Sequence, residues 1–271
     1  MKVLSGALLG LALAARLGVS YSQTPAQEPD WNRPVEPFRI IGNIYYVGTN
    51  ELGAYLLKTS EGAILVDGGL PQSAQLIAHS IEAIGVPLGS VKILVTTQAH
   101  FDHVGSLAEL AQKTGGRVMV MAGDAELVEK GGHGDYLFGD TMAFPPAKVG
   151  EVLHDGSTIT LGGTTLVAHL TPGHTKGCTT WTTTVREDGL TYAVVFPGSG
   201  SVNPGTRSSR IRPEESRYTR RDSRVSLDFP SAATCVPIVT QSAEKGASLI
   251  GPAACPKTTP PSATARNIQN G

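Results

Sequence analysis

The chain has 271 residues, a length that suits one large domain or two half-domains. Its formal net charge is −1, so charge gives no reason to expect binding to nucleic acid or to a membrane surface. Hydrophobic residues make up 40% of the chain, as in proteins with a buried core, and the 32 glycines and 18 prolines favour strands and turns.

Residues 1–22 have the features of a secretory signal peptide. Lys2 supplies the positive charge, residues 4–15 form an apolar stretch too short to cross a bilayer, and Ser22 is a small residue suited to a cleavage site. We therefore predict a periplasmic or secreted protein with no membrane attachment after cleavage. Residues 23–37 contain four prolines and are expected to form an extended leader.

Beyond the leader, the hydrophobic pattern alternates between strand and helix periods. Short apolar or alternating runs predict antiparallel strands at 40–47, 54–59 and 63–66, with turns at Gly42-Asn43 and Glu61-Gly62. Apolar residues on one helical face predict a helix at 71–84, followed by a strand at 91–97, a helix at 104–112 and a strand at 117–121. A further helix is expected to open at Asp124, as its N-cap.

The second half of the chain is richer in strands. Strands are expected at 151–153, 158–161, 164–170, 178–185 and 191–196, with a hairpin turn at Gly162 and Gly163. Alternating strands and helices in two halves predict two sheets that pack together with helices outside them.

The pattern changes after about residue 205. Seven arginines and no lysine occur between 207 and 224, and no histidine follows His174. We expect residues 207–271 to be an atypical tail rich in Arg, Ser and Pro, loop-rich or disordered, and we hypothesise that this tail is out of frame relative to a working ancestor. The arginines lack interleaved aromatic residues, so no nucleic-acid partner is expected.

The three cysteines are Cys178, Cys235 and Cys255, an odd number. In an oxidising compartment Cys235 and Cys255 could form a disulfide, but the sequence also allows both to stay unpaired. No Cys-x-x-Cys pair is present, which argues against thiolate zinc ribbons and thioredoxin chemistry.

The densest group of polar residues follows the apolar run at 91–95. Gln98, His100, Asp102 and His103 lie within six residues, and His174 occurs in a second loop further on. Imidazole and carboxylate groups are the ligands that zinc prefers, and a loop can present them from several directions. The sequence therefore predicts a metal site. The alternative is a polar loop whose histidines cap a helix.

The segment from Gln98 to His103 resembles the His-x-His-x-Asp-His signature of the metallo-β-lactamase superfamily, with Gln98 in place of the usual first histidine. Residues 65–69 and 171–175 match further landmarks of that family. Residues 177–181 and 197–205 are most similar to the third subclass of zinc β-lactamases. The resemblance covers about residues 36–206 and implies an αβ/βα four-layer sandwich in a domain at 38–206, with an incomplete second half.

The resemblance implies a role for each matched residue. A first zinc would bind Gln98, His100 and His174, and a second would bind Asp102, His103 and a final histidine that this chain lacks. Asp102 would also act in catalysis by holding the attacking water. Asp67 would orient a ligand, unless it is only a turn residue. Ser199 and Ser201 would lie near the substrate carboxylate and the second zinc, unless they are ordinary loop serines.

The implied activity is hydrolysis of the β-lactam amide bond, and hence antibiotic resistance, by a monomer that binds one or two Zn²⁺ ions. Its partner would be a small-molecule β-lactam. Because the second site lacks its final histidine, we expect weak activity. Two alternatives are another hydrolase of the same fold, acting on thioesters or lactones, and an inactive remnant that binds one zinc or none.

Overall fold

The computed structural model describes residues 31–203, 238–241 and 248–250. The predicted signal peptide, most of the leader, Cys235, Cys255 and much of the tail lie outside these residues. Cys178 is within them and is buried. No helix in the described ranges combines the length and the apolar character needed to cross a bilayer.

The first sheet has seven strands in sequence order: β1 (Phe38–Ile41), β2 (Ile44–Tyr46), β3 (Tyr55–Thr59), β4 (Gly62–Val66), β5 (Val91–Val95), β6 (Arg117–Met121) and β7 (Glu151–Leu153). Strands β1 to β4 pair antiparallel, whereas β4 to β7 pair parallel. The switch from antiparallel to parallel pairing follows from the connections, because short connections join the antiparallel neighbours and longer crossovers join the parallel ones.

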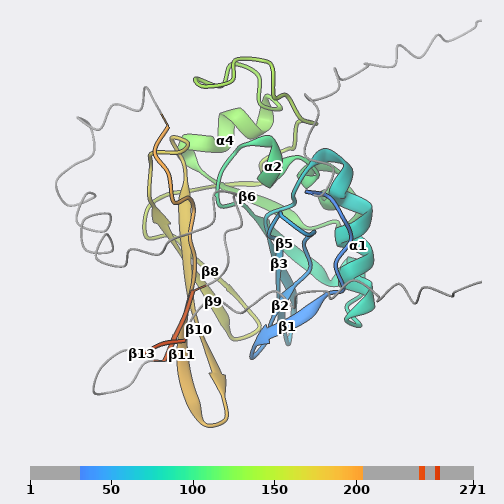
Figure 1. The fold of residues 1–271 in the computed structure, drawn as a ribbon, viewed down its shortest axis with the longest axis vertical. Coiled ribbons are helices and arrows are strands. Elements are labelled where there is room, and N and C mark those ends of the chain that lie inside the picture. Colours follow the sequence, from blue (N-terminus) through green and yellow to red (C-terminus); the bar gives the residue numbers. More distant parts are fainter. Residues whose placement is uncertain (1–30, 204–237, 242–247, 251–271) are drawn as a thin grey trace, which may run out of the picture.

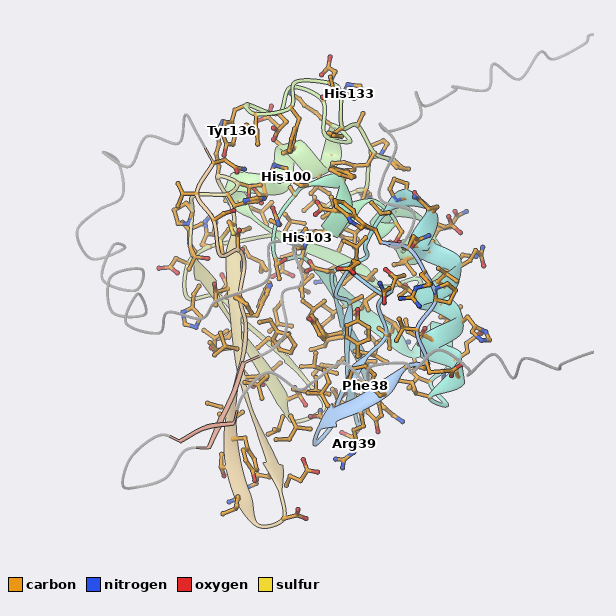
Figure 2. The ribbon with its side chains drawn as sticks, viewed as in Figure 1. Phe38, Arg39, His100, His103, His133 and Tyr136 are labelled. Carbon is orange, nitrogen blue, oxygen red and sulfur yellow. The ribbon has the colours of Figure 1, made fainter. Side chains whose placement is uncertain are left out.

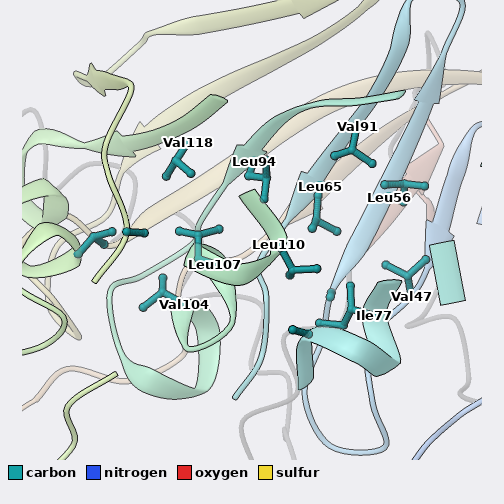
Figure 3. Packing of buried hydrophobic residues seen from close by; sticks show 14 of the residues in the cluster. Val47, Leu56, Leu65, Ile77, Val91, Leu94, Val104, Leu107, Leu110 and Val118 are labelled. Carbon is teal, nitrogen blue, oxygen red and sulfur yellow. The ribbon is translucent and has the colours of Figure 1, made fainter. Parts of the chain in front are cut away.

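The helical segments are η1 (Pro71–Ser73), α1 (Ala74–Ala83), η2 (Leu88–Ser90), α2 (Phe101–Val104), α3 (Leu107–Thr114) and α4 (Ala122–Glu129). Figure 1 shows α1 beside the first sheet, on the side away from the second sheet. In the close-up of Figure 3, Ile77 of α1 and Leu110 of α3 pack with Leu56, Leu65 and Leu94 of the sheet. These side chains are almost completely buried, so the apolar face predicted for the helix at 71–84 is the packed face.

The second sheet has the order β13-β12-β11-β10-β9-β8, and all of its pairs are antiparallel. Its strands are β8 (Thr158–Leu161), β9 (Thr164–Leu170), β10 (Thr179–Glu187), β11 (Leu190–Phe196), β12 (Ile238–Gln241) and β13 (Ser248–Ile250). Trp181 and Phe196 of this sheet share one buried cluster with Tyr55 and Ile64 of the first. The two sheets therefore pack face to face over a common core.

The predicted mixed α/β fold is confirmed. The turn expected at Gly42 and Asn43 separates β1 from β2 within the stretch at 40–47, and Gly42 has a φ of 51°. Two local differences concern the helices. The helix expected at 71–84 begins with the 3₁₀ turn η1, and the helix expected at 104–112 is two helices, α2 and α3. Within the described ranges, all helices precede residue 130 and three of the four expected layers are seen.

The sequence pattern predicted no strands after residue 206, but the structure has two there, β12 and β13. Strand β12 pairs with β11 and with β13, so residues 238–241 and 248–250 extend the second sheet. The local sequence Ile-Val-Thr at 238–240 carries the signal that this prediction overlooked, since β-branched residues favour strands.

Candidate metal centre

The candidate ligands meet at one end of the sandwich. The loop with Gln98 and His100 follows the carboxyl end of β5, and α4 follows the carboxyl end of the adjacent parallel strand β6. Figure 2 shows His100 and His103 at this end, opposite Phe38 and Arg39. Binding sites of open α/β sheets commonly lie beyond the carboxyl ends of parallel strands, because the connecting loops converge there.

Asp67 is in contact with His103 and with Thr97. Its carboxylate accepts hydrogen bonds from Thr97 N and Thr97 Oγ1, both at 2.7 Å, and from His103 Nδ1 at 3.1 Å. Asp67 is only 1% exposed and has a φ of 62°, a left-handed conformation that costs energy for a residue with a Cβ. The hydrogen bonds hold it there, and they leave His103 Nε2 as the ring nitrogen directed away from Asp67.

Gln98 and Asp102 lie on that other side of His103. The amide nitrogen of Gln98 is 2.7 Å from His103 Nε2, and Asp102 Oδ2 is 3.7 Å from the same atom. Burial lowers the pKa of His103, but the charges of Asp102 and Asp67 outweigh it and raise the pKa to about 9. Because a metal-binding imidazole must be neutral, metal binding at His103 requires the loss of this proton.

His100 lies in the loop after β5 of the first sheet and His174 in the loop between β9 and β10 of the second sheet, and their rings are in contact. Their ring centroids are 4.9 Å apart and their planes are inclined by 67°. Burial, reinforced by the charges of His100 and His103, lowers the pKa of His174 to about 4. Burial also lowers the pKa of His100, against the opposing charges of Asp135 and Asp102. Both rings are therefore neutral at neutral pH, the state in which imidazole binds a metal.

Asp124 joins the two ligand-bearing loops. Its carboxylate accepts hydrogen bonds from Ala99 N at 3.0 Å, Thr175 Oγ1 at 2.6 Å and Gly177 N at 2.7 Å. The prediction that Asp124 caps α4 is wrong, because Met121 occupies the N-cap position and Asp124 is buried in the first helical turn. Burial raises the pKa of Asp124 to about 6.

The close approach of α4 to the His174 loop depends on two glycines. A Cβ on Gly123 would lie 2.6 Å from the Lys176 carbonyl oxygen, and a Cβ on Gly177 would lie 2.4 Å from Asp124 N. Any side chain at either position would push the loop away from the helix. The glycines therefore allow the hydrogen bonds of Asp124 to form.

A loop after α4 lies over the pair of histidines; its glycines indicated that it could border the pocket, but the sequence did not identify the side chains that make the contacts. Asp135 Oδ2 lies 3.5 Å from His100 Nε2, and the Phe138 ring meets the His100 ring edge-on at 5.0 Å. The Tyr136 hydroxyl donates to the carbonyl oxygen of His174 at 2.8 Å, and Figure 2 places Tyr136 above His100. The only signal in the sequence was the cluster of glycines at 131–134, which indicates turns and no particular ligand.

Ser201 contacts His174, and Ser199 contacts Ser201. Ser201 Oγ is 2.9 Å from His174 Nδ1, and Ser199 Oγ accepts a hydrogen bond from Ser201 N at 3.1 Å. The resemblance placed both serines near the substrate carboxylate and the second zinc. In the structure Ser201 contacts His174, which the resemblance assigns to the first zinc.

Three buried polar atoms at this site fit a cation. Gln98 Oε1, His100 Nε2 and Asp135 Oδ2 are buried without a hydrogen-bond partner, a rare and costly state for polar atoms. Among the described residues no three His, Cys, Asp or Glu side chains already form a ready-made metal site. The donor chemistry nevertheless matches, since two neutral imidazoles, carboxylates and an amide oxygen gather in one place.

Comparisons with known proteins agree with this donor chemistry. The profile described as "Metallo-beta-lactamase superfamily" matches residues 54–186. The native FEZ-1 metallo-β-lactamase of Legionella gormanii is 39% identical, with a TM-score of 0.64 over 72% of this chain and 76% of that chain. The chain belongs to the metallo-β-lactamase superfamily.

Another similar member of the superfamily is LRA-12, a class B3 di-zinc metallo-β-lactamase from an Alaskan soil metagenome. It is 37% identical, with a TM-score of 0.68 over 77% of this chain and 81% of that chain. A probable metallo-hydrolase of Burkholderia pseudomallei is 31% identical over 164 residues, 58% of this chain and 53% of the relative. The chain spans about half the length of the first curated relatives it matches. The fold and the metallo-β-lactamase neighbours support a hydrolase.

Proposed function

We propose that this chain is a zinc-dependent hydrolase of the β-lactam amide bond. The observation that carries the proposal is the contact between His100 and His174, whose ring centroids lie 4.9 Å apart although the two residues lie in loops that follow strands of different sheets. Both rings have lowered pKa values, so both are neutral and able to bind a metal at neutral pH.

The residues divide into two ligand sets. Gln98, His100 and His174 would hold a first zinc, and Asp102 and His103 would hold a second. When bound, zinc supplies a water molecule of lowered pKa and a Lewis acid for the lactam carbonyl group. The amide oxygen of Gln98 is a neutral donor and a weaker ligand than imidazole, so the first set depends mainly on its two histidines.

The protein contributes orientation and proton transfer. Asp67 holds the His103 ring through Nδ1, and this contact keeps Nε2 directed at the site. The Asp102 carboxylate is 14% exposed and lies beside His103, where it can accept a proton from the attacking water and pass it to solvent. The substrate would be a small molecule, and the enzyme would act as a periplasmic or secreted monomer.

Turnover is expected to be slow. Of the three ligands that the resemblance assigns to the second zinc, the sequence has Asp102 and His103 but no histidine after His174. Loss of one direct ligand should weaken that site by more than the 10–100-fold that loss of an orienting partner costs.

The test uses the full chain with added zinc and four substrates: a carbapenem, a cephalosporin, a lactone and a thioester. We expect slow β-lactam hydrolysis that a chelator abolishes and zinc restores. His174→Ala should lose it, and His169→Ala is the matched control, since His169 contacts Thr182 on the second sheet. Turnover of only the lactone or the thioester would assign a different hydrolase. A protein that binds zinc but hydrolyses none of the four, or that binds none, would be an inactive remnant.

A further inference from the structure

The main chain of His174 is held in a different way from that of His100 and His103. The carbonyl oxygen of His100 accepts hydrogen bonds from His103 N at 2.9 Å and Val104 N at 3.0 Å, so helix α2 fixes both residues. His174 lies in a loop outside any helix or strand, and it follows Gly173, the residue type that restrains the backbone least. The position of His174 therefore depends on contacts from other parts of the chain.

Two side chains donate hydrogen bonds to the carbonyl oxygen of His174. The Tyr136 hydroxyl and Asn203 Nδ2 each lie 2.8 Å from this atom. Tyr136 comes from the loop after α4 and Asn203 from the segment after β11, so two distant parts of the chain meet at one oxygen atom. Asn203 N also donates to the carbonyl oxygen of Gly173 at 2.9 Å. The peptide group after His174 is thus held from two directions.

Tyr136 projects from a turn that is closed by its own hydrogen bonds. Asp135 Oδ1 accepts hydrogen bonds from Leu137 N at 2.7 Å and Phe138 N at 2.8 Å. The backbone of Asp135 also exchanges two hydrogen bonds with Gly139, at 3.2 and 2.9 Å. The hydroxyl group of Tyr136 is therefore presented from a firm support.

The Tyr136 side chain is 38% exposed, and Figure 2 shows it at the same end of the molecule as His100. A ring so open to solvent contributes little to the buried core, and its loss should cost little stability. The hydrogen bond to His174 is a specific contact that the ring alone could not make. Removal of the hydroxyl group can therefore be studied in a chain that keeps its fold.

We propose that Tyr136 is a positioning residue for the proposed zinc site, and that its hydroxyl group holds the main chain of His174 so that the His174 ring stays beside His100. Tyr136 acts through His174 in this role and touches neither metal nor substrate. The inference rests on the proposed zinc site but not on β-lactam turnover.

The first test is Tyr136→Phe, which removes the hydroxyl group and keeps the ring. Zinc affinity of the full chain, measured by chelator competition, should fall about 2–10-fold, the range expected for one hydrogen bond. Cobalt(II) in place of zinc gives a second readout, because its visible absorption depends on the arrangement of its ligands. The cobalt spectrum of the variant should differ from that of the unaltered chain.

Tyr45→Phe is the matched control, because it makes the same chemical change on β2, where the Tyr45 ring lies 5.2 Å from Lys58 Nζ. It should change neither the zinc affinity nor the cobalt spectrum. A Tyr136→Phe chain with unchanged affinity and spectrum, or an equal loss in both variants, would overturn the proposal. A chain that binds zinc but hydrolyses no β-lactam leaves these results readable, so the two proposals fail separately.

A second variant tests whether the shared carbonyl oxygen is the point of action. Asn203→Ala removes the other side-chain donor, and the double variant with Tyr136→Phe removes both. Because either donor can satisfy the same oxygen, the double variant should lose more zinc affinity than the product of the two single fold-changes. Fold-changes that simply multiply would mean that the two residues act independently, and would contradict positioning through this carbonyl group.

Discussion

The two halves of the site are built in different ways. The first half supplies Gln98, His100, Asp102 and His103 from a single loop, and Asp67 fixes that loop from the neighbouring strand. The second half supplies only His174, and its position depends on contacts made across the sandwich. The first half is therefore organised locally, whereas the second is organised by residues of the first.

The connection between the halves passes through Asp124, so its removal should have the largest effect. Asp124→Ala leaves Ala99 N, Gly177 N and Thr175 Oγ1 buried without their acceptor. We expect a loss of about 3 kcal/mol or more in the free energy of unfolding, measured by urea denaturation without metal. A loss below about 0.5 kcal/mol, typical of surface positions, would mean that Asp124 does not join the halves.

His174 is the only proposed ligand from the second half. His174→Ala should reduce zinc affinity more than about 100-fold, since direct ligands matter more than their orienting partners. Chelator competition measures the change, with His169→Ala as the control that should keep the affinity of the unaltered chain. Equal affinities for the two variants would remove His174 from the site.

Asp67 tests the local organisation of the first half. Asn tolerates the left-handed conformation at a φ of 62°, so Asp67→Asn removes the charge with little backbone strain. We expect zinc affinity to fall about 10–100-fold, because the His103 ring loses its charged partner. The fall should be smaller than that of His174→Ala. The reverse order would contradict the assignment of Asp67 as an orienting group.

The smallest effect is a pH dependence of stability. The raised pKa of Asp124, about 6, means that the folded state binds a proton more tightly than the unfolded state, whose pKa is about 3.9. The contribution of this group to stability therefore falls as pH rises from about 4 to 6, by less than about 1.4 kcal/mol per pH unit.

The measurement is the difference in unfolding free energy between the unaltered chain and Asp124→Asn, followed across that pH range without metal. The unaltered chain should lose stability relative to the variant as pH rises. A difference that stays constant, or that grows in favour of the unaltered chain, would contradict the raised pKa.

Local patterns predicted much of the fold. The strands from β1 to β11 follow from alternation and turn residues, and the buried face of α1 follows from the spacing of Ile77 and Ile81. The loop from Gln98 to His103 was also visible, because its ligand types are adjacent in sequence. The strand at Ile238–Gln241 was overlooked, since four residues carry too little periodicity amid the polar tail.

Long-range contacts explain what the sequence could not predict. Asp124 looks like a helix cap until the loops at Ala99 and Gly177 are placed beside it. Asp135 lies in a glycine-rich loop without any period, and only the fold brings it to His100. Both roles depend on residues distant in the chain, which no window of local sequence contains.

If His100 and His174 share one zinc ion, their contributions to zinc affinity are coupled, and a double-mutant cycle measures that coupling. Zinc affinity is measured for the unaltered chain, His100→Ala, His174→Ala and the double variant, with metal content determined in parallel. If one ion joins both rings, each single change should cost most of the affinity, and the double variant should lose far less than the sum of the two. Losses that add up in full, or a single variant that keeps the affinity of the unaltered chain, would contradict the shared ion.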